Sequence, residues 1–187
     1  MRYHRSDVVE RALEVLDDYG LASLTMRRLG AELGVQPSAL YHHFLNKQTL
    51  LAAVADEILA RGRRPRTASS WDGLVAEICC ELRDSMLAYR DGSDVVATVY
   101  AFGLGAAGPV EELTEVLADA GCSDELVAVG SRTLLHFVFG HTYEEQTALQ
   151  ANSVGAIDLP TRSSQFDLGL ALVVDGLRSR VEATVRV

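Results

Sequence analysis

The stretch that most constrains the fold is residues 24–47, LTMRRLGAELGVQPSALYHHFLNK. Thr25 stands at its start, and threonine is a favoured helix N-cap because its hydroxyl accepts a hydrogen bond from a free backbone N–H. Gly34 stands in its middle, where glycine ends a helix at positive φ without a steric penalty. Between the two, apolar side chains recur at helical spacing, at Met26, Leu29 and Leu33. These signals predict a short helix that ends in a tight turn.

A second short helix follows the turn and begins at Gln36 or Pro37, because proline at the first helical position loses no hydrogen bond. Leu40 and Phe44, four residues apart, face inward, and Asn46 caps a longer helix. The outward side chains are small, hydroxyl, imidazole and aromatic groups, from Ser38, Ala39, Tyr41, His42 and His43. This pattern predicts a helix-turn-helix that reads DNA; the alternative is a plain helical hairpin in a bundle.

Basic side chains surround this segment. Arg27 and Arg28 lie on the exposed side of the first helix, and Lys47 lies at a helix N-terminus, where phosphate is favoured. Arg27 is the best candidate for a guanine edge, and Tyr41 and His43 are expected on phosphates. The expected DNA-binding residues are Thr25, Arg27, Arg28, Gln36, Ser38, Ala39, Tyr41, His42, His43 and Lys47.

The run GLASLTMRRLGAELGV…LYHHFLNKQTLL resembles the DNA-binding domain of the tetracycline-repressor (TetR) family, including the ending LY-x-H-F-x-x-K. The resemblance is specific over roughly the first 60 residues. It implies double-stranded DNA as a partner. A reader of this kind is expected in two copies on a two-fold homodimer that binds a near-palindromic operator. The MRYHR terminus is then either a frayed end or an arm near the DNA backbone.

The charge is unevenly divided, although the net charge is −9. Residues 1–66 hold ten Arg or Lys and eight Asp or Glu, whereas residues 67–187 hold seven and eighteen. We expect a DNA-binding domain over residues 1–62, with a connecting helix over about 47–63, and a second domain over 67–187. The basic run RGRRPRTASS between them is a solvated linker or a source of extra DNA affinity.

The second domain reads as helical throughout, so the expected fold class is all-α. Two of its segments, LLHFVFGHTYEEQ and FDLGLALVVDGLRSRV, resemble the central and closing helices of the tetracycline-repressor subclass. That resemblance implies a ligand-binding domain that dimerises through helices over about 123–150 and 165–185. The closing helix has too many apolar residues for one stripe, which indicates two buried faces. The other predicted helices cover about 6–19, 70–89, 95–104 and 110–120, with a loop over 151–164.

A metal-bound tetracycline is not the expected ligand. In the subclass, the acidic position that matches Glu144 helps fix a magnesium ion carried by the drug. The positions that match its polar drug contacts are here apolar, at Ala60, Ile78, Val96 and Leu113. We expect a small hydrophobic effector instead, although plain core packing explains any single lining residue. The expected lining is Leu82, Met86, Val96, Tyr100, Leu113, Leu117, Ser131, Phe137, His141 and Leu170.

Other chemistries have weaker signals. His141 and Glu144, with His136 nearby, have a spacing that can hold a metal, but a surface or interface charge is favoured for Glu144. Gly103, Gly105 and Gly108 spell G-x-G-x-x-G outside any strand–helix–strand unit, so a flexible loop is favoured over nucleotide binding. No cofactor, metal or catalytic group is expected, and an enzyme is disfavoured.

The expected protein is a cytoplasmic, homodimeric transcription regulator, most simply a repressor that a small hydrophobic effector releases from DNA. No run is long and apolar enough for a membrane span, and no secretory leader opens the chain. The odd number of cysteines fits a reducing cytosol. Two alternatives stay open: a ligand-independent DNA-binding protein, and a redox-responsive regulator that uses Cys79, Cys80 and Cys122.

Overall fold

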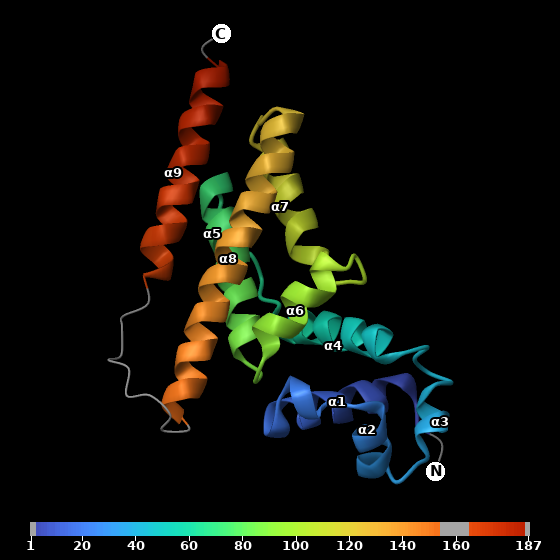
Figure 1. The fold of residues 1–187 in the computed structure, drawn as a ribbon. Helices are drawn as coiled ribbons and strands as arrows, with labels where there is room; N and C mark the ends of the chain where they lie inside the picture. Colours follow the sequence, from blue (N-terminus) through green and yellow to red (C-terminus); the bar gives the residue numbers. More distant parts are fainter. Residues whose placement is uncertain (1–2, 154–164, 186–187) are drawn as a thin grey trace. The chain divides into compact units, whose positions relative to one another are not determined.

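The computed structural model describes residues 3–153 and 165–185, with side chains up to residue 181 (Figure 1). All regular secondary structure in these ranges is helical, which confirms the predicted all-α class. The elements in chain order are α1 (Arg5–Tyr19), the 3₁₀ turn η1 (Leu21–Ser23), α2 (Met26–Leu33), α3 (Pro37–Leu40), α4 (Lys47–Gly62), α5 (Trp71–Leu87), α6 (Gly92–Ala101), α7 (Gly108–Asp119), α8 (Asp124–Ser153) and α9 (Phe166–Val185).

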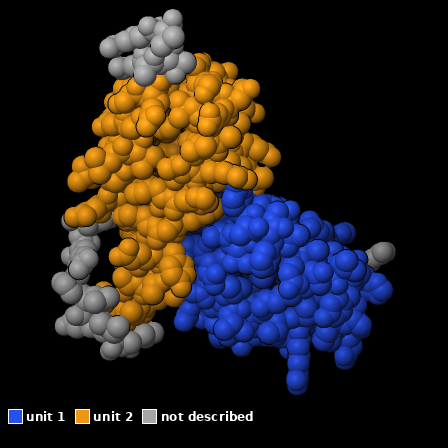
Figure 2. All heavy atoms as spheres, turned by 45° about the horizontal axis from the view of Figure 1, so that its top comes forward, with its two compact units in different colours: residues 1–63, 84–106 blue, residues 64–83, 107–187 orange. Residues whose placement is uncertain are grey.

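The chain forms two compact units (Figure 2). Unit 1 contains residues 1–63 and 84–106, and unit 2 contains residues 64–83 and 107–187. Helix α5 therefore contributes to both units, and unit 1 draws on a stretch beyond the predicted DNA-binding domain. The domain division between residues 62 and 67 stays a prediction.

The core of unit 1 begins with the apolar face of α1. The residues on that face are all buried, namely Val8, Val9, Ala12, Leu13, Val15 and Leu16. Helix α1 packs on α2 and on α4, whose buried residues are Leu50, Val54, Ala55 and Ile58. Three helices packed this way bury the apolar stripe of each one, which is the condition for a stable amphipathic helix.

We call residues 24–47 the reader. The helix caps and the glycine turn predicted for it are all present. The Thr25 hydroxyl accepts a hydrogen bond from the Arg28 backbone N–H at 3.1 Å. Gly34 ends α2 with a left-handed φ of 66°. Asn46 and Thr49 cap α4 reciprocally, since each side chain accepts from the backbone N–H of the other, at 2.9 and 3.2 Å. These contacts satisfy backbone donors that the first turns of α2 and α4 would otherwise leave free.

The segment 84–106 packs within unit 1 through α6, which lies against α4. Helix α6 spans residues 92–101, so the predicted range of 95–104 was three residues too late. The helix begins inside the sequence RDGSD, which resembles a turn, because left-handed Asp91 turns the chain directly into α6. Val95, Val96 and Val99 are buried, whereas Phe102 and Leu104 lie beyond the helix and are exposed.

Unit 2 is built from the first part of α5 and from α7, α8 and α9. Helix α7 packs on α8, and α8 packs on α9. Gly130 on α8 permits close approach, because a Cβ there would lie 2.9 Å from Leu177 of α9 and 3.2 Å from Leu117 of α7. Helix α8 continues to Ser153, so residues 151–153 are helical where a loop was predicted. The rest of that predicted loop lies outside the described residues.

Within the described ranges, no helix combines the length and the apolar character that crossing a membrane requires.

Candidate nucleic-acid interface

The candidate interface is built by the turn between α2 and α3. The Val35 backbone N–H donates to the Gly30 carbonyl at 2.9 Å, which closes the turn behind left-handed Gly34. Gly30 is needed there, because a Cβ would lie 2.9 Å from the Val35 carbonyl oxygen. This tight reversal brings α3 next to α2, as a helix-turn-helix requires.

Helix α3 is shorter than a full recognition helix. It covers Pro37–Leu40 and passes into a hydrogen-bonded turn, in which the N–H groups of His43 and Phe44 donate to the Leu40 carbonyl at 2.9 and 3.0 Å. Leu40 and Phe44 are buried, as expected from their spacing. Their burial anchors the turn in the core of unit 1, and Tyr41 and His42 between them are exposed.

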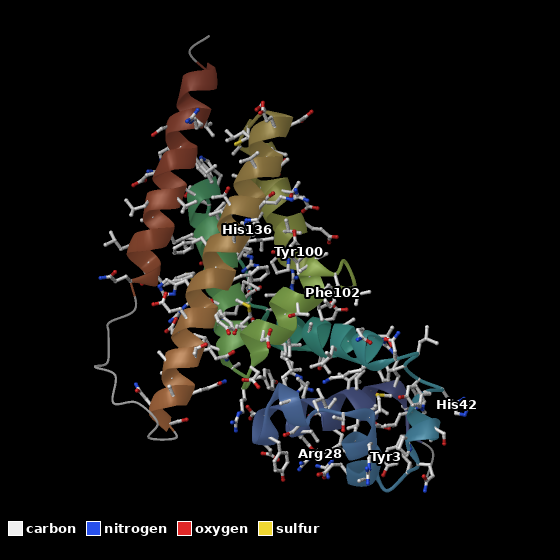
Figure 3. All side chains as sticks on the ribbon, in the orientation of Figure 1. Tyr3, Arg28, His42, Tyr100, Phe102 and His136 are labelled. Carbon is white, nitrogen blue, oxygen red and sulfur yellow. The ribbon has the colours of Figure 1, made fainter. Side chains whose placement is uncertain are left out.

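The ten predicted DNA-binding residues lie on α2, α3, the following turn and the first turn of α4, all in unit 1. Figure 3 labels two of them, Arg28 and His42. Arg28, His43 and Lys47 are half-buried. The exposed members are Thr25, Arg27, Gln36, Ser38, Ala39, Tyr41 and His42. No contact with DNA is present, so their roles stay predictions.

The two neighbouring arginines of α2 differ in their surroundings. The Arg28 guanidinium lies 3.7 Å from the centroid of the Tyr19 ring and 3.5 Å from the Glu32 carboxylate. Glu32 also pairs with Arg11 of α1 at 3.5 Å, so Arg28 belongs to a network that joins α2 to α1. Arg27 is exposed and has no ion pair among the described residues. Arg27 is therefore the side chain free to contact a base, and Arg28 is held by the protein.

Lys47 is the first residue of α4 and has no ion-pair partner among the described residues. The backbone N–H groups and the dipole of a helix N-terminus favour an anion at the same place. A phosphate contact by Lys47 stays a prediction.

The described start of the chain, from residue 3, is ordered by contacts with the protein, whereas an arm near the DNA backbone stays untested. Arg5 is the first residue of α1, and its guanidinium lies 4.7 Å from the centroid of the Phe44 ring. The His4 backbone N–H donates to the Asp7 carboxylate at 2.7 Å. Residues 4 and 5 therefore belong to the cap and the first turn of α1. The contact between Arg5 and Phe44 depends on the tertiary fold and could not be read from the sequence.

The predicted effector-lining residues are divided between the units. Met86, Val96 and Tyr100 belong to unit 1, and the first two are buried. Within unit 2, Phe137 and His141 are half-buried and the other members are buried, at Leu82, Leu113, Leu117, Ser131 and Leu170. The Ser131 hydroxyl donates to the Val127 carbonyl of its own helix at 2.8 Å, so it is already satisfied.

The candidate metal ligands do not converge. Glu144 and His136 are exposed, and His141 Nδ1 lies 3.7 Å from Glu145 rather than against Glu144. In the described part of the chain, no group of three or more His, Cys, Asp or Glu side chains is arranged so that it could hold a metal ion. His141 instead packs on two aromatic rings, with ring centroids 5.8 Å from Phe137 and 5.2 Å from Phe166.

The three cysteines are free thiols. Cys79 is fully buried in α5, and this burial raises the pKa of its thiol to about 12. Burial also raises the pKa of Cys122. A raised pKa lowers the fraction of reactive thiolate, which weakens the redox alternative.

The fold and the candidate interface together define a helix-turn-helix DNA-binding protein with an attached helical body. Residues 8–54 match the family described as "Bacterial regulatory proteins, tetR family", and residues 64–165 match "Tetracyclin repressor-like, C-terminal domain". The chain belongs to the tetR family of bacterial regulatory proteins. The resemblance predicted from the sequence is confirmed for both parts of the chain.

The similarity to known proteins extends over almost the whole chain. The tetracycline repressor protein class C from Escherichia coli is 32% identical, over 94% of this chain and 91% of its own. The crystal structure of Mycobacterium smegmatis BioQ has 43% identity and a TM-score of 0.88, and it covers 95% of this chain and 99% of its own. BioQ is also solved with a double-stranded DNA operator, with a TM-score of 0.83, 42% identity, and 94% and 98% coverage.

A third relative is solved with a small molecule. Streptomyces coelicolor ActR in complex with (S)-DNPA is 29% identical, with a TM-score of 0.78, and covers 96% of this chain and 98% of its own.

Proposed function

We propose that the protein is a homodimeric transcriptional repressor that binds a near-palindromic operator and leaves it when a small hydrophobic effector binds. The observation that carries the proposal is the reader itself. Its exposed turn has hydroxyl, imidazole and phenol groups. Arg27 and Lys47 flank the turn, and neither has an ion pair in the part of the chain that the structure describes. That combination supplies base-edge and phosphate contacts. BioQ, 42% identical, is solved on its DNA operator, which supports the same partner here.

Dimerisation is supported by apolar side chains that unit 2 leaves uncovered. Leu168 and Leu172 of α9 are 65% and 68% exposed, although Leu170 between them is buried. Helix α8 exposes Val129, Tyr143 and Leu149. Large exposed apolar side chains concentrated on two helices are typical of a protein–protein interface. We assign them to a second copy of the chain, as the sequence predicted for these two helices.

The dimer is tested by light scattering of the Leu168→Glu and Leu172→Glu variants. We expect each to give the mass of a monomer. Leu104→Glu is the control, since it places the same charge at another exposed leucine, in unit 1. If the α9 variants remain dimeric, the interface lies elsewhere.

The effector proposal rests on residue chemistry. The positions that match the polar drug contacts of the tetracycline-repressor subclass include Ile78 and Leu113, and both are buried and apolar in unit 2. ActR, solved with (S)-DNPA, supports a small-molecule effector for this chain as well. A hydrophobic effector that binds preferentially to a form with low DNA affinity lowers the affinity for DNA. Bound DNA must then lower the affinity for the effector by the same factor. Tenfold induction requires about 1.4 kcal/mol of such coupling.

The decisive experiment is a gel shift of the full chain on DNA flanking its own gene and on a pool of random genomic fragments, with competitor DNA at two salt concentrations. A shift that resists competitor and weakens with salt is expected. If competitor DNA removes every shifted band, the ligand-independent DNA-binding alternative is favoured. If neither DNA gives a shifted band, the proposal is refuted. The same complex then serves to screen hydrophobic compounds for release. As a DNA-bound regulator of a bacterial family, the protein is expected to act in the cytoplasm.

A further inference from the structure

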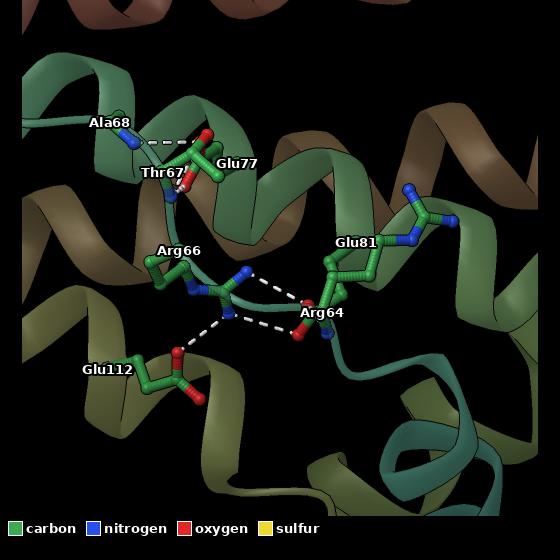
Figure 4. Close-up of polar contacts among 7 residues, drawn as sticks. All are labelled: Arg64, Arg66, Thr67, Ala68, Glu77, Glu81 and Glu112. Atoms are coloured by element: carbon green, nitrogen blue, oxygen red, sulfur yellow. Dashed lines mark hydrogen bonds and ion pairs between the residues drawn. The ribbon is translucent and has the colours of Figure 1, made fainter.

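The linker that follows α4 is held in place by carboxylates (Figure 4). Residues 64–68 are the linker between α4, which begins at the end of the reader, and α5. The chain passes between unit 1 and unit 2 here, and again at residues 83 and 106. The sequence suggested a solvated basic linker or extra arginines for DNA. The structure shows neither for Arg66, which is half-buried and ion-paired within unit 2.

Glu81 of α5 is the centre of the arrangement. Its carboxylate accepts a hydrogen bond from the Arg64 backbone N–H at 2.6 Å. It also accepts from both terminal nitrogens of Arg66, at 2.9 and 3.0 Å, in a two-pronged pairing. Glu112 of α7 accepts a further hydrogen bond from Arg66 at 2.7 Å. Two carboxylates therefore fix one guanidinium, and one of them also fixes the backbone.

Glu77 holds the next part of the linker. It lies one helical turn before Glu81, so the two carboxylates share a face of α5. The backbone N–H groups of Thr67 and Ala68 donate to it at 3.0 and 2.9 Å, and the Thr67 hydroxyl donates as well. We call Arg66, Glu77, Glu81 and Glu112 the linker clamp.

The Arg66–Glu81 pair of the clamp is sheltered enough to persist in ordinary salt. The Arg66 and Glu81 side chains are 23% and 11% exposed. Partly buried charges are screened much less than surface pairs, and two-pronged arginine–carboxylate pairs are stronger than single contacts. The clamp also leaves little slack, because only Arg63 separates Gly62, the last residue of α4, from the clamped Arg64.

We propose that the linker clamp sets the half-site spacing that the protein accepts in its operator. This inference rests on the proposed function, a dimer that presents two readers. Two readers on short, fixed connections reach half-sites at one spacing, whereas readers on looser connections reach a wider range of spacings. The clamp residues are thus positioning residues, and they act on DNA through the connection to α4.

The test compares Glu81→Gln with Glu145→Gln. Both changes neutralise a carboxylate that pairs with an arginine while keeping its volume. Glu145 of α8 accepts from Arg83 at 2.8 Å, away from the linker. Dissociation constants are measured for the operator with its footprinted spacing and for versions with one to three base pairs inserted between half-sites.

The wild-type protein and Glu145→Gln should lose affinity steeply with each insertion. In Glu81→Gln, the ratio of dissociation constants between inserted and native spacing should fall by at least about fivefold, the size of a modest coupling between sites. A general loss of stability lowers affinity at every spacing and leaves this ratio unchanged. An unchanged ratio would overturn the proposal.

Limited trypsin digestion of the full chain reports the clamp directly. Trypsin must take the arginine side chain into its specificity pocket, so a clamped Arg66 should protect the bond between Arg66 and Thr67. We expect faster cleavage there in Glu81→Gln, and in Glu77→Gln if the first variant folds poorly. Equal cleavage in both variants and the wild type would refute the clamp. Absence of dimer or operator binding in the wild type would instead refute the proposed function, and the spacing role with it, whatever the digestion shows.

Discussion

The Asp56 carboxylate of α4 accepts a hydrogen bond from the backbone N–H of Ala106 at 2.8 Å, within unit 1. Ala106 has a left-handed φ of 58°, which is unusual for a residue with a side chain. It is nearly fully buried, so the strained conformation is part of the packed structure. The contact ties the segment after α6 back to the helix that begins at the reader.

This pair gives two opposite stability changes. Ala106→Gly should stabilise the protein by roughly 0.5–1 kcal/mol, because the relief of left-handed strain exceeds the entropy that glycine adds to the unfolded chain. Asp56→Ala should destabilise it by about 1 kcal/mol through loss of the hydrogen bond. Urea unfolding followed by circular dichroism measures both. Destabilisation by Ala106→Gly would show that the strain is not released.

Arg27→Ala and Tyr41→Ala should abolish specific operator binding and leave the dimer intact. Both side chains are exposed on the reader, and neither supports the core. Gel shifts with competitor DNA and light scattering provide the two measurements. Arg90→Ala is the matched control, since it removes an exposed arginine of unit 1 outside the reader elements. Native operator affinity in either reader variant would mean that the interface is wrongly placed.

The Arg28→Ala and Arg27→Ala variants should differ in their free energy of unfolding. Arg28→Ala loses the contact with Tyr19 and the ion pair with Glu32, and it should cost roughly 0.5–1 kcal/mol in the free energy of unfolding. Arg27→Ala should change stability by less than about 0.5 kcal/mol, as exposed substitutions usually do. Equal costs for the two variants would contradict the assignment of Arg28 to the α1–α2 network.

Lys47→Ala should weaken binding to all DNA sequences by a similar factor. A lysine that neutralises one phosphate adds about one to the slope of log affinity against log salt concentration, so the slope should become shallower by about that amount. The measurement is a salt titration of operator and non-specific DNA, with Lys47→Arg retaining the charge. A change in sequence preference without a change in slope would mean that Lys47 contacts a base.

Cys79 should resist alkylation in the native protein. Because burial raises the pKa of its thiol to about 12, only a very small fraction carries the thiolate at pH 8. The reactive fraction rises with pH, so labelling should increase as the pH approaches 12 or when the chain is unfolded. Mass spectrometry after iodoacetamide treatment should find the half-buried Cys122 modified before Cys79. Rapid native labelling of Cys79 would revive the redox alternative.

The reader was largely predictable because its signals are local. Thr25, Gly34 and Asn46 act through neighbours within a few residues, and the buried face of α1 follows from helical spacing alone. The start of α6 was missed because Asp91, Gly92 and Ser93 are turn-forming residues, and burial of Gly92 and Ser93 overrides that preference.

The partners of charged side chains were not predictable. Arg66 and Glu112 lie far apart in the sequence and meet only after α5 and α7 have folded. The same is true of Arg28, whose stacking on Tyr19 depends on how α1 crosses α2. A sequence shows which residues are charged, whereas the fold decides which of them remain available to DNA. The sequence favoured Arg27 for a base contact, but the contact of Arg28 with Tyr19 became known only with that crossing.

The discontinuity of unit 1 has a consequence for recombination between relatives. Residues 84–106 bind back to the first part of the chain, through Asp91 to the Leu21 backbone N–H at 2.7 Å and through the Arg90 N–H to Asp17 at 3.1 Å. A chimera joined after residue 63 would separate these pairs and leave backbone donors and carboxylates without matched partners. The exchangeable cassette of this regulator is therefore two pieces of sequence, and a hybrid needs crossover points near residues 63, 83 and 106.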